Sequence, residues 1–208
     1  MPISQIITNS IADSAVVTVD IANGAVTSAK IATGAVASTN IAAGAVALAT
    51  QTSGVLPKAS LPSGSILQVV GNNLLPSVQF STASASYVTW ATAPSATITL
   101  TNSANRVLIT ARIGMQFDAG DQIENTIYRI ISGGATTDLS NGNTYGLSFH
   151  GTSFSGGLWK ETVITWIDTP ATASAVTYTW YARAESGGLI YPDHGGAANT
   201  ITLMEIAA

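Results

Sequence analysis

The chain has 208 residues and a net charge of −4, with room for one ordinary domain plus an appendage. Only 9% of its residues are charged, against about 25% in typical soluble domains. Its seven basic residues are scattered singly, which argues against a nucleic-acid partner because phosphate binding needs clustered Lys and Arg. The absence of cysteine excludes disulfides and thiolate metal sites. The longest purely apolar run, residues 41–49, is far shorter than the roughly 20 residues of a membrane helix, so no membrane insertion is expected.

Residues 11–50 are four near-copies of one ten-residue unit: IADSAVVTVD, IANGAVTSAK, IATGAVASTN and IAAGAVALAT. An Ile opens each unit and a Val holds its sixth position, so a large apolar residue recurs every five positions. This spacing makes no stripe on an α-helix, and on a plain strand it alternates between the two faces. Two backbone geometries are compatible with it. One is a narrow solenoid that turns at each Gly, and the other is a shaft of several intertwined chains.

Repeated units of this kind cannot bury their apolar side alone, and so few large apolar residues cannot make a stable core within one chain. We therefore expect copies of the same chain to supply the missing surface. The residues predicted to form this shared core of the shaft are Ile11, Val16, Ile21, Val26, Ile31, Val36, Ile41 and Val46. The tenth-position residues Asp20, Lys30 and Asn40 are expected to face solvent.

Residues 51–63 are predicted to be a linker, since Pro57, Pro62 and Gly54 interrupt any regular pattern there. Residues 64–208 then alternate β-branched or aromatic residues with polar ones, which is the pattern of half-buried strands. The predicted strands are residues 65–70, 87–90, 96–101, 106–117, 125–131, 161–168, 175–184 and 199–207. The fold class is therefore all-β, a repeat shaft followed by an antiparallel β-sandwich or jelly-roll head. Strand aromatics expected in the core or at a subunit interface are Trp90, Phe117, Trp166, Tyr178 and Trp180.

The sequence offers little for catalysis. Its two histidines, His150 and His194, lie in Gly-rich segments, and no GxSxG elbow accompanies the many serines. A metal site built from these histidines and Asp193 is less favoured than simple exposure. We therefore predict no enzymatic activity and no bound cofactor.

Three acidic residues, Asp118, Asp121 and Glu124, lie close together between two predicted strands. Clustered carboxylates can bind calcium, but their spacing does not fit the twelve-residue calcium loop. A solvated turn is the favoured interpretation of this segment.

Two Gly-rich segments, residues 141–159 and 185–196, mix aromatic with small polar side chains, which is typical of adaptable recognition surfaces. An aromatic ring can stack on the apolar face of a sugar while Asn and Asp bond its hydroxyls. The candidate receptor-binding residues are Tyr145, Phe149, His150, Trp159, Tyr191, Asp193 and His194. The alternative is that these aromatic residues belong to the core or pack between subunits.

The repeat IANGAVTSAKIATGAV resembles segments of the tail fibres of tailed bacteriophages. GSILQVV after a Pro-rich linker, in a chain ending ITLMEIAA, resembles the small head domain of such fibres. The resemblance covers nearly the whole chain. It implies a virion protein that forms a homotrimer, in which residues 1–50 form the shaft and attach to other tail or capsid proteins. The head would contact a glycan or protein on the host surface without catalysis.

Three alternatives stay open from the sequence. The first is a capsid decoration or cement protein, whose repeat would thread over the capsomers. The second is a monomeric adhesion module of a bacterial surface, and the third is an enzyme that degrades surface polysaccharide.

Overall fold

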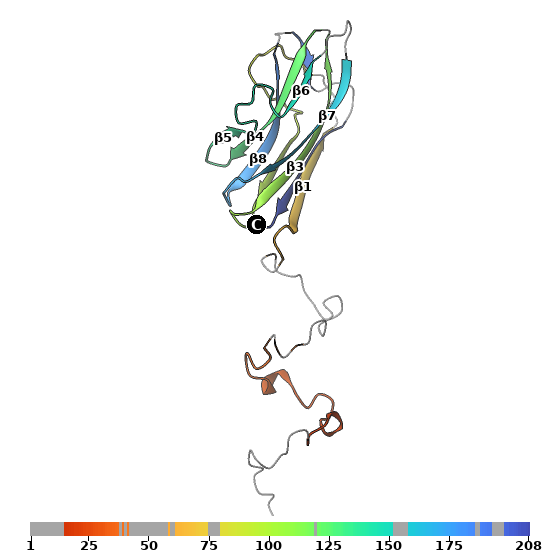
Figure 1. Ribbon diagram of the computed structural model, residues 1–208, viewed down its shortest axis with the longest axis vertical. Helices are drawn as coiled ribbons and strands as arrows, with labels where there is room; N and C mark the ends of the chain where they lie inside the picture. The colour runs from red at the N-terminus through yellow and green to blue at the C-terminus, as the bar shows by residue number, and fades with distance from the viewer. Residues whose placement is uncertain are drawn as a thin grey trace, which may run out of the picture. The chain divides into compact units, whose positions relative to one another are not determined.

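The computed structural model describes residues 15–37, 39, 41, 58, 61–74, 80–118, 120–151, 158–185, 188–192 and 198–208. The chain divides into two compact units, Met1–Val55 and Leu56–Ala208 (Figure 1). Of the residues predicted for the shaft core, Ile11 and Val46 lie outside the described residues. In the part of the chain that the structure describes, no helix is long and apolar enough to cross a membrane.

The sequence repeat is also a repeat of backbone conformation. Two short 3-10 helices, η2 (Thr18–Asp20) and η3 (Ser28–Lys30), occupy equivalent positions in consecutive units. In each of them the last amide donates to the carbonyl that precedes the helix, with an N–O distance of 2.9 Å. Asp20 also accepts a hydrogen bond from the amide of Val17 at 3.0 Å. The tenth position therefore favours a polar residue that closes the local turn.

Glycine at the fourth position of the unit has a conformational reason. Gly24 and Gly34 have φ angles of +78° and +79°, in the left-handed region that side chains disfavour. Each lies in a turn closed by a hydrogen bond of 2.9 Å. The Ala25 amide donates to the Ala22 carbonyl in one unit, and the Ala35 amide donates to the Ala32 carbonyl in the next. In both of these units the Gly therefore allows the backbone to turn at the fourth position.

The single chain does not cover the predicted shaft core. The described Ile and Val residues of that core are between 41% and 57% exposed. They are Val16, Ile21, Val26, Ile31, Val36 and Ile41. Among the described residues of the repeat, packing between units of one chain therefore does not bury these side chains.

Residues of the second unit form two five-stranded sheets, in which every strand pairing is antiparallel. Sheet A has the order β1-β10-β3-β7, with β9 beside β3, and sheet B has the order β2-β8-β4-β5, with β6 beside β4. The strands of sheet A are β1 (Ile66–Leu74), β3 (Arg106–Phe117), β7 (Leu158–Asp168), β9 (Ile190–Tyr191) and β10 (Asn199–Ile206). Those of sheet B are β2 (Ser95–Thr99), β4 (Gln122–Ile131), β5 (Thr136–Asp138), β6 (Ser148–Gly151) and β8 (Ala175–Ala184).

The β-sandwich prediction is confirmed, with differences in detail. The strand predicted at residues 87–90 is only an isolated bridge between Val88 and Ala182. Three short strands, β5, β6 and β9, escaped prediction because they are too short to show alternation.

The core lies between the two sheets, and alternation within the strands builds it. One face of β3 is fully or almost fully buried, at Val107, Ile109, Ala111, Ile113 and Met115. From sheet B, Tyr178 and Trp180 on β8 are 0% exposed, as expected for core aromatics. The indole nitrogen of Trp180 donates to the side-chain oxygen of Asn125 at 3.0 Å, so its polar atom is satisfied inside the core.

A buried ion pair joins the two sheets. Arg129 on β4 donates to both oxygens of Asp168 on β7, at 2.9 and 3.1 Å. The Tyr178 hydroxyl donates to the same carboxylate at 2.8 Å, and burial is the main reason that the pKa of Tyr178 is raised. Because these residues come from three strands in two sheets, the network fixes how the sheets are placed on each other.

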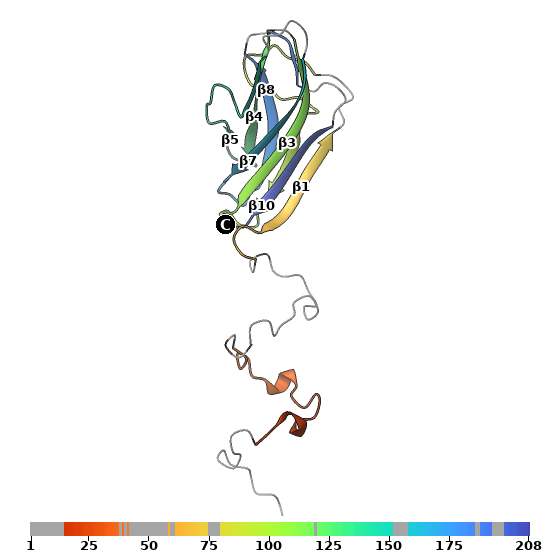
Figure 2. The same ribbon diagram turned by 45° about the vertical axis from the view of Figure 1, so that its right-hand side comes forward.

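The pairing register defines the two ends of the sandwich. Ile66 at the start of β1 pairs with Ile206 at the end of β10, whereas Leu74 pairs with Asn199. The end of β3 and the starts of β4 and β7 lie at the Leu74 end (Figures 1 and 2). We call this the far end, because it is opposite to the point where the chain enters β1.

Candidate recognition surface

An exposed aromatic pair is formed by Tyr145, on the connection between β5 and β6, and Phe149, on β6 itself. The rings of Tyr145 and Phe149 meet edge to face, with centroids 5.0 Å apart and planes at 61°. Tyr145 is 54% exposed and Phe149 is 38% exposed, although both are large apolar rings. Such a pair offers apolar ring surface and, through the Tyr hydroxyl, a polar group at the same place.

Hydrogen bonds and close packing hold the backbone on both sides of Tyr145. The Asn143 side chain accepts a hydrogen bond from the Tyr145 amide at 3.2 Å. Gly146 has a φ of +65°, and a Cβ atom there would lie 2.6 Å from the Tyr87 hydroxyl oxygen. The next amide, of Leu147, donates to the Asn125 carbonyl on β4 at 2.8 Å. The loop is therefore a fixed platform for the aromatic pair.

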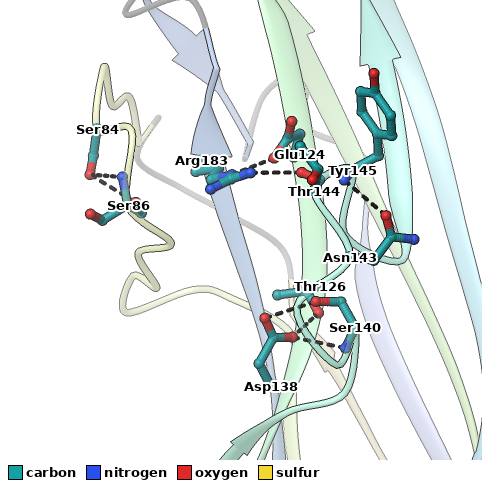
Figure 3. A network of polar contacts seen from close by, with 10 residues as sticks. All are labelled: Ser84, Ser86, Glu124, Thr126, Asp138, Ser140, Asn143, Thr144, Tyr145 and Arg183. Carbon is teal, nitrogen blue, oxygen red and sulfur yellow. Dashed lines mark hydrogen bonds and ion pairs between the residues drawn. The ribbon is translucent and has the colours of Figure 1, made fainter.

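A buried ion pair supports this platform from beneath. Arg183 on β8 donates through Nε to the Glu124 carboxylate on β4, and through Nη2 to the Thr144 carbonyl at 2.6 Å (Figure 3). Glu124 is 0% exposed. The guanidinium also lies over the Tyr87 ring, 4.8 Å from its centroid, and burial raises the pKa of Tyr87 to about 12. One arginine thus connects two strands, the loop and the neighbouring segment.

The beginning of the same loop is fixed by Asp138. Its carboxylate accepts hydrogen bonds from the Thr126 hydroxyl at 2.6 Å, and from the Ser140 amide and hydroxyl at 2.9 and 2.8 Å (Figure 3). Ser140 is 8% exposed and Thr126 is fully buried. The loop is therefore tied to the outer face of sheet B at both of its ends.

The interpretation of Glu124 as part of a solvated turn was wrong. Its side chain lies under the loop and pairs with Arg183, because β4 begins at Gln122 and continues through it. Asp118 is exposed, as a turn residue would be. Among the described residues, no group of three or more His, Asp or Glu side chains is arranged to hold a metal ion.

The other candidates that the structure describes lie away from this surface. His150 is half-buried, and its Nε2 is 2.6 Å from the Thr162 hydroxyl on β7 and 3.2 Å from that of Ser148. Burial, with a smaller contribution from Lys160, lowers the pKa of His150. It thus bridges the two sheets rather than facing outward beside Phe149.

Trp159 and Tyr191 belong to the other sheet. Trp159 is exposed on β7, and Tyr191 is half-buried on β9, and both are paired with Gln116 of β3. Asp193 and His194 lie outside the described residues. Of the five candidates among the described residues, the structure therefore unites only Tyr145 and Phe149.

The supporting residues Arg183, Glu124 and Tyr87 were not predicted from the sequence. The sequence did contain a sign of this ion pair. Arg183 lies in a strand otherwise rich in Tyr, Trp and Ala, and an arginine that becomes covered in such a strand needs a charged partner. The identity of that partner depends on which strand lies beside β8.

No family is shown for this chain by its similarity to known proteins. No protein-family model matches the chain, and no curated protein sequence matches it. Solved structures that resemble part of it include infectious bursal disease virus strain Gx, at 19% identity over 74% of this chain and 41% of that chain, with a TM-score of 0.40. T=1 particles derived from the virus match at 17% identity over 74% and 40% of the two chains, with a TM-score of 0.35. The chain spans about two-fifths of the length of these chains. At TM-scores this low, neither the fold nor the function of this chain follows from the likeness.

Proposed function

We propose that this chain is a virion structural protein, a homotrimeric tail fibre whose head binds a glycan on the host cell surface without catalysis. The observation that carries the proposal is the uncovered apolar side of the repeat, whose Ile and Val residues are 41–57% exposed in the single chain. Apolar residues that recur in register with a repeated backbone indicate a surface shared with other copies. Such a shaft supports the tail-fibre resemblance of the repeat.

The aromatic pair supports the binding part of the proposal. Tyr145 is exposed on a loop that hydrogen bonds and a buried ion pair hold in place, and Phe149 is exposed on the adjoining strand β6. A rigid aromatic surface loses little entropy when it binds. Stacking on a sugar ring is weak at one site, but three heads on one fibre would raise the avidity.

The homotrimer is tested by the solution mass of the full chain, measured by light scattering on a sizing column. We expect about three times the chain mass of 21.2 kDa. A monomeric full chain would contradict the shared-core argument and, with it, the fibre.

Glycan binding is tested with the full chain on an array of bacterial surface polysaccharides. Tyr145→Ala and Phe149→Ala are expected to weaken binding by about tenfold or more, as for a central aromatic contact. Thr97→Ala is the matched control, because Thr97 is exposed on the same sheet in β2, outside the loop. Equal binding by all three variants would remove this surface from the proposal.

Location on the particle separates the fibre from the decoration-protein alternative. Antibodies against the chain are expected to label tails separated from shells. Label confined to the shells would favour the capsid decoration protein instead.

A further inference from the structure

The outer face of sheet A carries an apolar row that crosses all four main strands. The register aligns Val69 of β1 with Met204 of β10, then with Leu108 of β3 and Ile167 of β7. Val69 and Ile167, at the two edges, are 57% and 52% exposed, and the two central residues are half-buried. Figure 2 shows three of these strands, β1, β10 and β3, lying side by side. We call these four residues the apolar row.

The outer face of sheet B is built differently. There, Ser95 and Thr97 of β2 lie opposite Thr179 and Thr177 of β8, and each pair shares a hydroxyl–hydroxyl hydrogen bond of 2.8 Å. Hydroxyl ladders of this kind suit a face in contact with water. An antiparallel sheet normally has one apolar and one polar face, so apolar residues on both faces of sheet A indicate that both are covered.

The two edges of the apolar row differ in shape. On the β7 side an open groove of about 360 Å³ is lined by Leu108, Thr165, Trp166 and Ile167. On the β1 side, Val69 is exposed at the opposite edge of the sheet. One edge can therefore receive a side chain that the other edge presents.

The charges on this face permit close approach of another apolar surface. The row itself contains no charged residue. Two rows farther along, Arg112 is paired with Glu161 on the neighbouring strand, and in the adjoining row on the other side Arg106 is exposed. Packing against the apolar row would thus bury no unpaired charge of the row. A buried, unpaired charge is the main obstacle to covering a sheet face.

We propose that the outer face of sheet A is the surface through which the heads of this protein pack against one another. The proposal rests on the proposed homotrimer and names the part of the head that completes it. The occupant is another copy of this chain, because the repeat leaves apolar side chains uncovered as well, and copies joined there would be at high effective concentration at the head. One partner then covers both surfaces.

Threefold symmetry determines which residues meet. In a closed ring of three, each copy uses two different surfaces, so the contact is heterologous. The β1 edge of one head then faces the β7 edge of the next, and Val69 of one copy approaches the groove beside Ile167 of its neighbour. A twofold dimer would instead bring like edges together.

Cysteine cross-linking of the full chain tests this arrangement, because the natural sequence has no cysteine. The double variant Val69→Cys/Ile167→Cys, treated with a short bis-maleimide, is expected to give covalent trimers on a denaturing gel. A second pair two rows along, Asn73→Cys/Val163→Cys, repeats the test if the first variant does not fold. Thr97→Cys, exposed on the outer face of sheet B, is the control and should stay monomeric on the gel.

The outcomes separate the two proposals when the solution mass is measured on the same samples. A trimer by light scattering with covalent trimers on the gel supports the interface. A trimer by light scattering without cross-links between copies would overturn it and leave the fibre intact, with sheet A available to another protein. A cross-linked dimer from the single variant Val69→Cys would overturn the threefold ring in favour of a twofold contact between like edges. A monomer by light scattering would overturn both the interface and the homotrimer.

Discussion

Removing Arg183 isolates the interaction that supports the aromatic platform. In the variant Arg183→Ala, the Glu124 carboxylate, which is 0% exposed in the natural chain, loses its ion-pair partner. The Thr144 carbonyl loses a hydrogen bond of 2.6 Å, and the Tyr87 ring loses the cation above it. All three groups contribute to the support of the loop that carries Tyr145.

The expected cost follows from the burial of the two partners. Removing one member of a buried ion pair costs about 3–5 kcal/mol, because the other charge is left without compensation. A quarter of the Arg183 side chain is exposed, so water can enter the vacated space, and the lower value of about 3 kcal/mol is appropriate. For a chain of this size we expect the melting temperature to fall by roughly 6–12 °C.

The assay is thermal unfolding of the full chain, followed by tryptophan fluorescence at one fixed protein concentration, since the proposed assembly would make the melting temperature depend on concentration. Glu124→Gln should cost less, because the amide oxygen still accepts from Arg183. The double variant Arg183→Met/Glu124→Gln should be more stable than Arg183→Ala, because no charge is left buried and unpaired. Lys160→Ala, at an exposed position, controls for the loss of one positive charge.

Two results would refute the reasoning. One is an Arg183→Ala melting temperature no lower than that of Lys160→Ala. The other is a double variant no more stable than Arg183→Ala, which would show that the unpaired charge is not the source of the loss.

Three further predictions concern a histidine, a loop glycine and the repeat. The pKa of His150 is lowered in the folded chain from about 6.5, so the unfolded chain binds more protons below that pH. Stability is therefore fully present above pH 6.5 and declines as the pH falls below it, and His150→Gln should reduce this decline in melts recorded across that range. Gly146→Ala should lower the free energy of unfolding, measured by denaturant titration, by about 2 kcal/mol or more, because the new methyl group would collide with Tyr87 in a left-handed backbone. Gly142→Ala, where the methyl group would enter open space, should cost less in the same titration. Val26→Asp together with Val36→Asp should abolish the trimer in light scattering, since each charge would be buried unpaired, and an unchanged mass would show that these side chains point outward.

Much of the head could be predicted because alternation is a local property of the chain. Buried positions of β3, such as Ile109 and Ile113, follow from every second residue being apolar. The same regularity indicated that Trp180 belongs to the core. Short strands such as β6 contain too few residues for alternation to be recognised, and their pairing with β4 depends on the rest of the sheet.

Residue type and order alone establish the repeat and its spacing of large apolar residues, and from these they predict a partner surface. The sequence also placed Tyr145 in a loop rich in small polar residues, whereas Phe149, expected in the same loop, lies on β6. What that loop rests on was decided by the tertiary structure, since Glu124 and Arg183 meet only when β4 and β8 pair.

The apolar row is the clearest case of a feature that only the fold could decide. Val69 and Met204 are far apart in the chain and become neighbours because β10 pairs with both β1 and β3. Alternation within one strand shows that two faces differ, but it does not show which strands lie beside each other. Sheet order depends on contacts between distant segments, and it is this order that turns four separate side chains into one surface.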